Sequence, residues 1–253
     1  MKAIRIMAAV LALAGLCFAS AAMAAAPAKQ VKSITVATDA TWPPMEMVDA
    51  NKKIVGFDID FMTAVAKEAG FQVTFKNTAW DGIFAGVEAG QYDAIISSVT
   101  ITDERKAKYD FSAPYINIGQ VLVVPKAEKG SKIADLKGKK IGAQIGTTGA
   151  MEVKKNAGVE LKTYDEVGLA FEDMAAGRIA GVVCDEPTAV TYALQKKEYN
   201  TKFKIVGKPF TTEAYGIVVK KGNKDLAALI NKGIAAVQKK KIDAQLKKKW
   251  QLK

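Results

Sequence analysis

The apolar positions of the chain recur with two periods, one of two residues and one of three to four. The alternation of these periods predicts a strand at 33–39, a helix at 55–70, a strand at 71–76, a helix at 80–90 and a strand at 92–98. The first helix closes on a glycine, a residue typical of helix ends. This βαβαβ order is typical of a parallel sheet covered by helices.

The same order begins again in the second half of the chain. The pattern predicts a strand at 138–145, a helix at 148–158, a strand at 159–165, a helix at 166–177 and a strand at 179–185. The segments AGQYDAIIS and AGRIAGVVC, 87 residues apart, both place two residues between Ala-Gly and an apolar strand. This weak internal repeat predicts two α/β units of similar construction.

We expect two extended segments, 116–126 and 211–222, to connect the units, and the C-terminal helices to complete the first of them. We therefore expect an α/β fold of two parallel-sheet lobes joined by a two-strand hinge. Lobe 1 would comprise 31–118 and 216–253, and lobe 2 would comprise 119–215. In open α/β sheets, ligands bind beyond the carboxyl ends of the strands.

The N-terminus has the pattern of a secretory signal peptide. A short basic region precedes an apolar run, and the small residues at 22–24 match a cleavage site. We expect a signal peptide over 1–24, cleavage after about Ala24 and a periplasmic protein. Cys17 allows a lipoprotein signal as an alternative, although Leu16 stands where such signals have Gly or Ala.

Composition narrows the range of partners. The chain of 253 residues is 49% hydrophobic and 25% charged, as globular proteins are. Its net charge of +11 would suit nucleic acid, but many lysines lie in QKKKIDAQLKKKW, where Ile242, Leu246 and Trp250 recur at helical spacing. Those lysines fit the solvated side of an amphipathic helix, and an exported protein meets little nucleic acid. We therefore expect no nucleic-acid partner.

Histidine is absent, and Cys184 is the single cysteine beyond the signal peptide. Ser-His and Cys-His catalysis are thereby excluded, as is an intramolecular disulfide in the processed chain. The commonest transition-metal ligand is also missing, and we expect neither a metal nor a cofactor.

Polar residues gather where the predicted strands end. The segment SSVTITDER at 97–105 places Ser98 and Thr100 before a helix that begins near Thr102, with Arg105 in its first turn. A cation is unfavourable at that end of a helix dipole. Arg105 therefore either forms a surface ion pair with a nearby aspartate or offers its guanidinium to a bound anion.

The second unit carries its own polar strand ends. Asp185 either caps the next helix, with Pro187 near the first position, or binds a cation. The IGTTGA turn, which contains Thr148, either is an ordinary capped turn or holds an anion on its backbone N–H groups. It matches no nucleotide-binding motif.

Two tryptophans and an aspartate complete the set. Trp42 precedes a double proline that stiffens its loop, and Trp80 opens the second helix. These rings either pack within the lobes or stack on a flat or aliphatic ligand. Asp39, at the end of the first strand, either caps a turn or meets the far end of a ligand.

Taken together, these segments resemble the periplasmic amino-acid-binding proteins that serve ABC importers. The resemblance extends from about Val31 to Trp250 and is carried by ATDATWPPME, VGFDIDFMTAVAKEAG, AIISSVTITDERKAKYDFSAPY, LKGKKIGAQIGTTG, AGRIAGVVCDEPTAV and the final KKKW. It implies the type II periplasmic-binding-protein fold, in which a free amino acid is clamped between two lobes.

The resemblance also implies a role for each residue at the constant end of the ligand. Arg105 would bind the α-carboxylate, assisted by Ser98 and Thr100. Thr148 would add a carboxylate contact from the other lobe. Asp185 would hold the α-ammonium group.

Around the side chain of the ligand, the resemblance places Trp42 and Trp80 on the two faces and Asp39 near the end. Asp39 suits a cation or an amide donor, and Gln144 adds a neutral donor and acceptor. We therefore expect a basic amino acid, with arginine or lysine first and histidine or glutamine next.

The implied function is that of an extracytoplasmic receptor, not an enzyme. It would close on a free L-amino acid and deliver it to the membrane subunits of an ABC permease. We expect a monomer. An enzyme on the same scaffold, similar to cyclohexadienyl dehydratase, is the alternative and would need a positioned acid such as Asp39 or Glu46. A sensory or adhesin module is a third reading.

Overall fold

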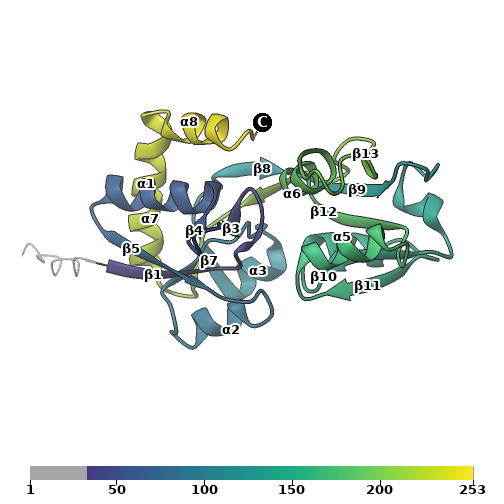
Figure 1. Ribbon diagram of the computed structural model, residues 1–253. Helices are drawn as coiled ribbons and strands as arrows, with labels where there is room; N and C mark the ends of the chain where they lie inside the picture. The colour runs from purple at the N-terminus through teal and green to yellow at the C-terminus, as the bar shows by residue number, and fades with distance from the viewer. Residues whose placement is uncertain (1–32, 253) are drawn as a thin grey trace, which may run out of the picture. The chain divides into compact units, whose positions relative to one another are not determined.

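The computed structural model describes residues 33–252 (Figure 1). The expected signal peptide over 1–24 and the alternative lipoprotein signal at Cys17 lie outside the described residues. Within 33–252, each helix is too short or too polar to cross a bilayer.

Five strands in the order β5-β1-β6-β15-β7 form the first sheet. They are β5 (Gln72–Asn77), β1 (Ser33–Thr38), β6 (Ala94–Ile95), β15 (Val218–Lys220) and β7 (Tyr109–Phe111). Strand β1 runs parallel to both of its neighbours, whereas β15 runs antiparallel to β6 and β7.

The second sheet repeats this arrangement with the order β11-β10-β12-β9-β13. Its strands are β11 (Glu160–Tyr164), β10 (Lys140–Gln144), β12 (Gly181–Asp185), β9 (Gln120–Pro125) and β13 (Phe203–Val206). Here β10 is parallel to both neighbours and β9 is antiparallel to both. The internal repeat in the sequence thus corresponds to two sheets of the same topology, which form the two lobes.

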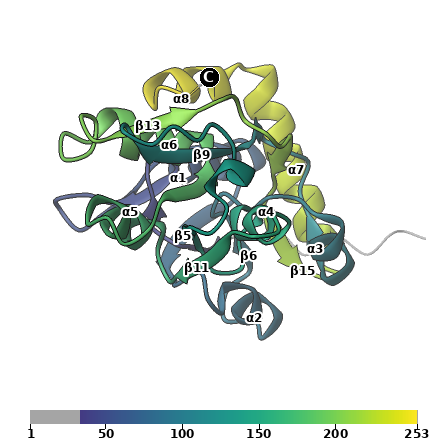
Figure 2. The same cartoon turned by 90° about the vertical axis from the view of Figure 1, so that its right-hand side faces the viewer.

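The helices of the first lobe are α1 (Phe57–Ala69), α2 (Ile83–Glu88), α3 (Asp103–Lys108), α7 (Lys224–Lys239) and α8 (Ile242–Lys249). Helix α1 packs against α7 and β5, as Figure 1 shows, and Figure 2 shows α8 following α7 at the yellow end of the chain. A Cβ on Gly233 would lie 2.4 Å from the Val65 carbonyl oxygen, so glycine is needed where α7 crosses α1.

Sequence expectations for these helices are confirmed at their ends. Helix α1 stops at Gly70, whose φ of 83° is the left-handed conformation that glycine adopts readily. Ile242, Leu246 and Trp250 of the C-terminal segment pack against the apolar core of the first lobe. The lysines between them remain on the solvated side.

The second lobe has shorter helices: η1 (Ile133–Leu136), α4 (Thr148–Lys154), α5 (Val167–Ala175), α6 (Glu186–Val190) and η2 (Thr191–Gln195). Its core contains an aromatic stack in which the rings of Phe171 and Tyr192 lie 4.3 Å apart. Cys184 is buried in the same core.

The expected two-strand hinge is present. Strands β8 (Ile116–Ile118) and β14 (Glu213–Tyr215) pair antiparallel as a separate two-stranded sheet. The expected lobe boundaries, at 118 and 216, fall at the ends of these strands and remain a prediction.

The sheets are mixed rather than wholly parallel. After β8 the chain enters the second sheet as the antiparallel strand β9, and after β14 it enters the first sheet as the antiparallel strand β15. A strand that arrives from the other lobe enters the sheet from the opposite end and therefore runs antiparallel. The local periodicity of apolar residues does not reveal this direction. Each hinge strand is thereby continuous with a central strand of a lobe.

A small three-stranded sheet carries Trp42. It consists of β2 (Thr41–Trp42), β3 (Glu46–Val48) and β4 (Ile54–Val55). Trp42 pairs with Glu46 across β2 and β3. This sheet fixes the tryptophan loop above the carboxyl end of β1.

Candidate functional site

A small pocket lies where the carboxyl ends of the two sheets face each other. It is lined by Trp42, Trp80, Ser97, Ser98, Thr100, Arg105, Thr147, Thr148 and Asp185. All of the predicted site residues except Asp39 and Gln144 are in this lining. Ser97 and Thr147 are additions that the sequence reading did not name as site residues.

Arg105 is positioned by the start of helix α3. Thr102 caps the helix by accepting a hydrogen bond of 3.1 Å from the Arg105 backbone N–H, as the sequence predicts. The guanidinium donates to the carbonyl oxygen of Thr100 at 2.8 Å and to that of Gly146 at 3.2 Å. It also lies over the rings of Trp80 and Phe84, 5.5 and 5.3 Å from their centres.

This guanidinium is buried without an ion-pair partner. Arg105 is only 8% exposed. The aspartates that the sequence offers as surface partners are engaged elsewhere, Asp103 with Lys106 at 2.7 Å and Asp110 with Lys221 at 3.1 Å. No carboxylate in residues 33–252 pairs with Arg105. A buried cation of this kind needs an anion, because desolvation otherwise makes it costly.

Asp185, at the end of β12, is a buried group of the opposite charge. Its carboxylate is 6% exposed and accepts hydrogen bonds from Tyr215 Oη at 2.7 Å and from Gln120 Nε2. It makes no side-chain capping bond to helix α6, so the capping alternative does not explain it. Burial raises the pKa of this carboxyl to about 7; Glu213 adds to the rise, and the hydrogen bonds from Tyr215 and Gln120 oppose it. Asp185 is thus a buried acid without a cation.

Glu213, on hinge strand β14, is a residue that the sequence reading missed. Its Oε2 accepts hydrogen bonds of 2.8 Å from the hydroxyls of Thr100 and Thr148, one from each lobe. Because a hydroxyl has a single proton, neither threonine can also donate to a ligand carboxylate while bonded to Glu213. In this arrangement the Thr100 oxygen can accept from an ammonium group instead, whereas Thr148 Oγ1 already accepts from Gln120 Nε2 at 3.1 Å. The alternation of Thr211, Glu213 and Tyr215 on a predicted strand is the signal that could have found it.

Asp39 and Gln144 lie behind Trp42 rather than in the pocket lining. Gln144 accepts a hydrogen bond from Trp42 Nε1 and donates to Asp39 Oδ2 at 2.8 Å. Asp39 also accepts from the Thr41 hydroxyl at 2.9 Å. Gln144 therefore joins the tryptophan loop of the first lobe to β10 of the second. A stacked ligand between Trp42 and Trp80 remains a prediction, and Trp80 already supports Arg105.

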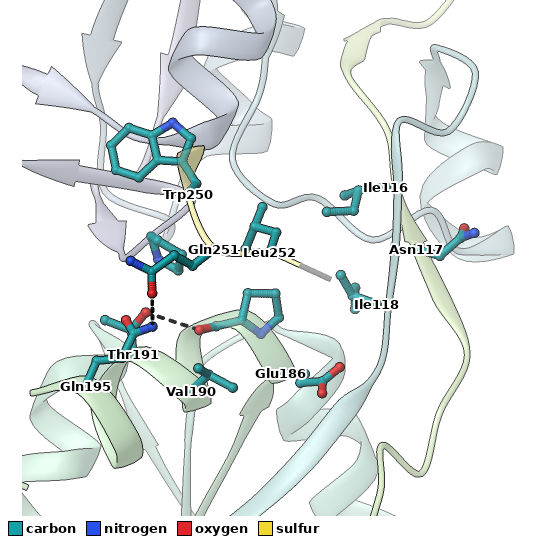
Figure 3. Close-up of a pocket in the computed structure, with 12 residues that line it drawn as sticks. Ile116, Asn117, Ile118, Glu186, Val190, Thr191, Gln195, Trp250, Gln251 and Leu252 are labelled. Atoms are coloured by element: carbon teal, nitrogen blue, oxygen red, sulfur yellow. Dashed lines mark hydrogen bonds between the residues drawn. The ribbon is translucent and has the colours of Figure 1, made fainter. Parts of the chain in front are cut away.

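A second pocket, of about 60 Å³, lies beside the hinge (Figure 3). It is lined mainly by apolar residues of β8, α6 and the C-terminus, and Glu186 is its one ionisable residue. Gln195 donates to Gln251 across it at 3.4 Å. A zwitterion would find no cation there, so the smaller pocket with both charges is the better candidate. Within 33–252, no cluster of three potential metal ligands occurs.

Comparisons with known proteins show the family of this chain. The model of the bacterial extracellular solute-binding proteins, family 3, matches residues 34–253. The L-cystine-binding protein TcyJ of Escherichia coli is 35% identical over 88% of this chain and 84% of its own. A probable histidine-binding protein of Neisseria gonorrhoeae is 36% identical over 85% of this chain and 82% of its own.

Solved structures of amino-acid-binding proteins are also similar to this chain. An ancestral arginine-binding protein bound to arginine is 42% identical, with a TM-score of 0.82 over 86% of this chain and 97% of its own. An ancestral arginine-binding protein bound to glutamine has a TM-score of 0.83 and 42% identity over 88% of this chain and 99% of its own. These neighbours share the type II periplasmic-binding-protein fold that the sequence predicts.

Replacement of the buried guanidinium tests whether Arg105 is there for an anion. We expect Arg105→Ala to weaken amino-acid binding by about 2–5 kcal/mol, because the ligand carboxylate loses its partner, while the melting temperature without ligand stays close to wild type. Calorimetric titration and thermal melts measure the two effects. Arg178→Ala, which removes an exposed arginine paired with Asp173, is the matched control and should bind normally. Undiminished binding by Arg105→Ala would contradict this assignment.

The raised pKa of Asp185 predicts pH-dependent binding. An ammonium group pairs with the ionised carboxyl, so below pH about 7 the ligand must displace a proton from Asp185. Affinity should therefore fall as the pH drops, by up to about tenfold per unit, and level off above neutrality. Titrations in buffers of different ionisation enthalpy should show proton release. A flat affinity with no proton exchange would show that Asp185 does not pair with the ligand.

Proposed function

The chain belongs to family 3 of the bacterial extracellular solute-binding proteins, and on this basis we propose that it is a periplasmic receptor for a basic L-amino acid. It closes on the free amino acid, arginine or lysine first, and presents it to the membrane subunits of an ABC permease. The signal-peptide pattern of the N-terminus supports the periplasmic location.

The observation that carries the proposal is a pair of buried, opposite charges in one pocket. Arg105 and Asp185 come from different lobes, and neither forms an ion pair within residues 33–252. A free amino acid at neutral pH carries one carboxylate and one ammonium group. It would supply the missing partner for both residues at once, which a simple anion or cation would not do.

Closure is supported by hydrogen bonds between the lobes at the pocket. Arg105 of the first lobe donates to the Gly146 carbonyl of the second at 3.2 Å, and the hydroxyls of Thr100 and Thr148 lie 3.4 Å apart. Gln144 bonds to Trp42 beside them. A ligand held by both Arg105 and Asp185 would favour this closed arrangement over an open one, as a receptor of this kind requires.

The acid behind Trp42 supports a basic ligand. Gln144 is bonded to Asp39, to Trp42 Nε1 and to the Asp165 carbonyl oxygen, so a guanidinium or ammonium group that reached Asp39 would replace the Gln144 amide as its donor. The ancestral arginine-binding proteins solved with arginine and with glutamine are consistent with a guanidinium or an amide at this end of the ligand. Histidine and glutamine are the next candidates, and the cystine-binding relative adds cystine.

Proton-transfer chemistry has less support. Asp39 and Glu46, the acids that an enzyme on this scaffold would use, do not line the pocket. We accordingly propose a monomeric binding protein rather than an enzyme.

A thermal-shift panel of the twenty amino acids with cystine added tests the function. A ligand at one hundred times its Kd should add about 2.7 kcal/mol to the free energy of unfolding, and we expect the largest shifts with L-arginine or L-lysine. Arg105→Ala in the same panel is the control and should show no shift. If none of the compounds raises the melting temperature, the receptor proposal is wrong; if another amino acid gives the largest shift, only the basic ligand is wrong.

A further inference from the structure

A pair of carboxyl groups lies behind the pocket, outside its lining. Glu46 is on β3, directly across from Trp42, and Asp58 is in the first turn of α1. Both residues are completely buried, with 0% exposure. Buried carboxyl groups are rare unless each is paired, so their hydrogen-bond partners need an explanation.

The pair holds the turn that follows β6. Glu46 accepts hydrogen bonds from the hydroxyls of Ser97 and Ser98, each at 3.3 Å. Asp58 Oδ2 accepts from the Ser98 backbone N–H and from Tyr115 Oη, both at 2.8 Å. Ser97 and Ser98 line the ligand pocket, and Ser98 has a φ of 50°, which a serine rarely adopts without such restraint.

One oxygen of the pair has no conventional partner. Asp58 Oδ1 is buried and receives no hydrogen bond from a donor group in the described chain. Glu46 and Asp58 both accept hydrogen bonds from Ser98, so their carboxyl groups lie near each other, and each affects the ionisation of the other. Two ionised carboxylates cannot bond to each other, but a proton on Glu46 would turn this contact into an O–H···O⁻ hydrogen bond.

The surroundings favour that proton. The ionisable groups that face Glu46 are Asp58, Asp39, Tyr115 and Tyr215, all of which are acids. Burial and the charge of Asp58 raise the pKa of Glu46 well above its ordinary value. Burial also raises the pKa of Asp58, to about 6, although the bonds from Ser98 and Tyr115 oppose the rise.

We propose that Glu46 is a positioning residue that keeps a proton at neutral pH and shares it with Asp58, and that this shared proton holds the Ser97–Ser98 turn and the Trp42 strand in their binding geometry. The inference about affinity rests on the proposed receptor function. The inference that Glu46 and Asp58 share a proton is independent of that function.

Loss of the proton would place two negative charges in contact in a dry environment. Their repulsion would displace the elements that each carboxyl holds: Ser97 and Ser98 through Glu46 and Asp58, and Trp42 through its strand pairing with Glu46. Ligand affinity should therefore decline as the pH rises through the pKa of Glu46. This is the opposite direction to the effect of Asp185, which weakens binding on acidification.

The free energy of unfolding should also depend on the protonation of Glu46. In the unfolded chain Glu46 ionises near its ordinary value of 4.5, whereas in the folded chain it stays protonated to a higher pH. The folded state binds more protons in that interval, so the free energy of unfolding falls as the pH rises through it. Below the ordinary value both states are protonated, and the residue contributes no pH dependence.

Amide substitutions distinguish the two carboxyls. Glu46→Gln keeps a donor toward Asp58 Oδ1 and cannot ionise, so L-arginine binding should weaken by only about threefold at neutral pH, and the alkaline decline should flatten. Asp58→Asn replaces an acceptor of Ser98 and Tyr115 with a group that carries donor hydrogens, and it should weaken binding by about tenfold or more. Glu160→Gln alters an exposed glutamate of the second lobe and should reproduce the wild-type pH profile.

A second measurement needs no ligand. In an Asp185→Asn background, which removes the other buried carboxyl that is partly protonated at neutral pH, the infrared spectrum at neutral pH should contain the C=O stretch of a buried protonated carboxyl group. This band should be lost when Glu46→Gln is added but kept when Glu160→Gln is added. Presence of the band without L-arginine binding by the wild-type protein would contradict the proposed ligand and leave the shared proton intact. Absence of the band, or a Glu46→Gln variant whose affinity and melting temperature keep the wild-type alkaline decline, would overturn the inference.

Discussion

Two buried charges that lack ion-pair partners among residues 33–252 are the constraint on which this structure depends. The guanidinium of Arg105 and the carboxylate of Asp185 are held in one pocket by neutral groups: backbone carbonyls for the first, and Gln120 and Tyr215 for the second. Neutral hydrogen bonds orient a buried charge but do not neutralise it. The pocket is therefore complementary to a molecule that carries both charges, and a free amino acid is the simplest one.

The topology explains how groups so far apart in the sequence meet. Each sheet presents the carboxyl ends of its parallel strands to the pocket, and each hinge strand continues into one of the sheets. Glu213 and Tyr215 on β14 contact residues of both lobes, and Gln120 begins β9 directly after the hinge. The hinge strands thus supply part of the hydrogen-bonding environment of the ligand site. A change in hinge angle would alter those contacts together with the distance between Arg105 and Asp185.

Periodicity was sufficient for elements that form locally. Helix α1 could be predicted with its stop at Gly70, and the Thr102 cap could be read from its sequence, because both depend on neighbouring residues. The antiparallel strands β9 and β15 could not, since their direction depends on the lobe from which the chain arrives. Local patterns also left Asp185 undecided between a helix cap and a ligand partner, because the same residue type serves both.

The residues behind the site were the hardest to predict. Glu213 contacts Thr100 across 113 positions, and no local pattern links them. Glu46 appears in the sequence as an acid after a double proline. Its complete burial near Asp58 depends on the tertiary structure and cannot be read from neighbouring residues. A charge that looks ordinary in sequence acquires its chemistry from desolvation, which depends on everything packed around it.

Removal of one charge from the ligand at a time measures the pairing most directly. Calorimetric titration would compare L-arginine with agmatine, which lacks the carboxylate, and with Nα-acetyl-L-arginine, which lacks the ammonium group; L-glutamine and 4-aminobutanamide form a second pair for an amide ligand. If Arg105 and Asp185 each pair with one end of a zwitterion, every truncated compound should bind weaker than its parent by about 2–5 kcal/mol. Equal affinity of agmatine and L-arginine, or of the two amides, would show that the pocket does not recognise the amino-acid backbone.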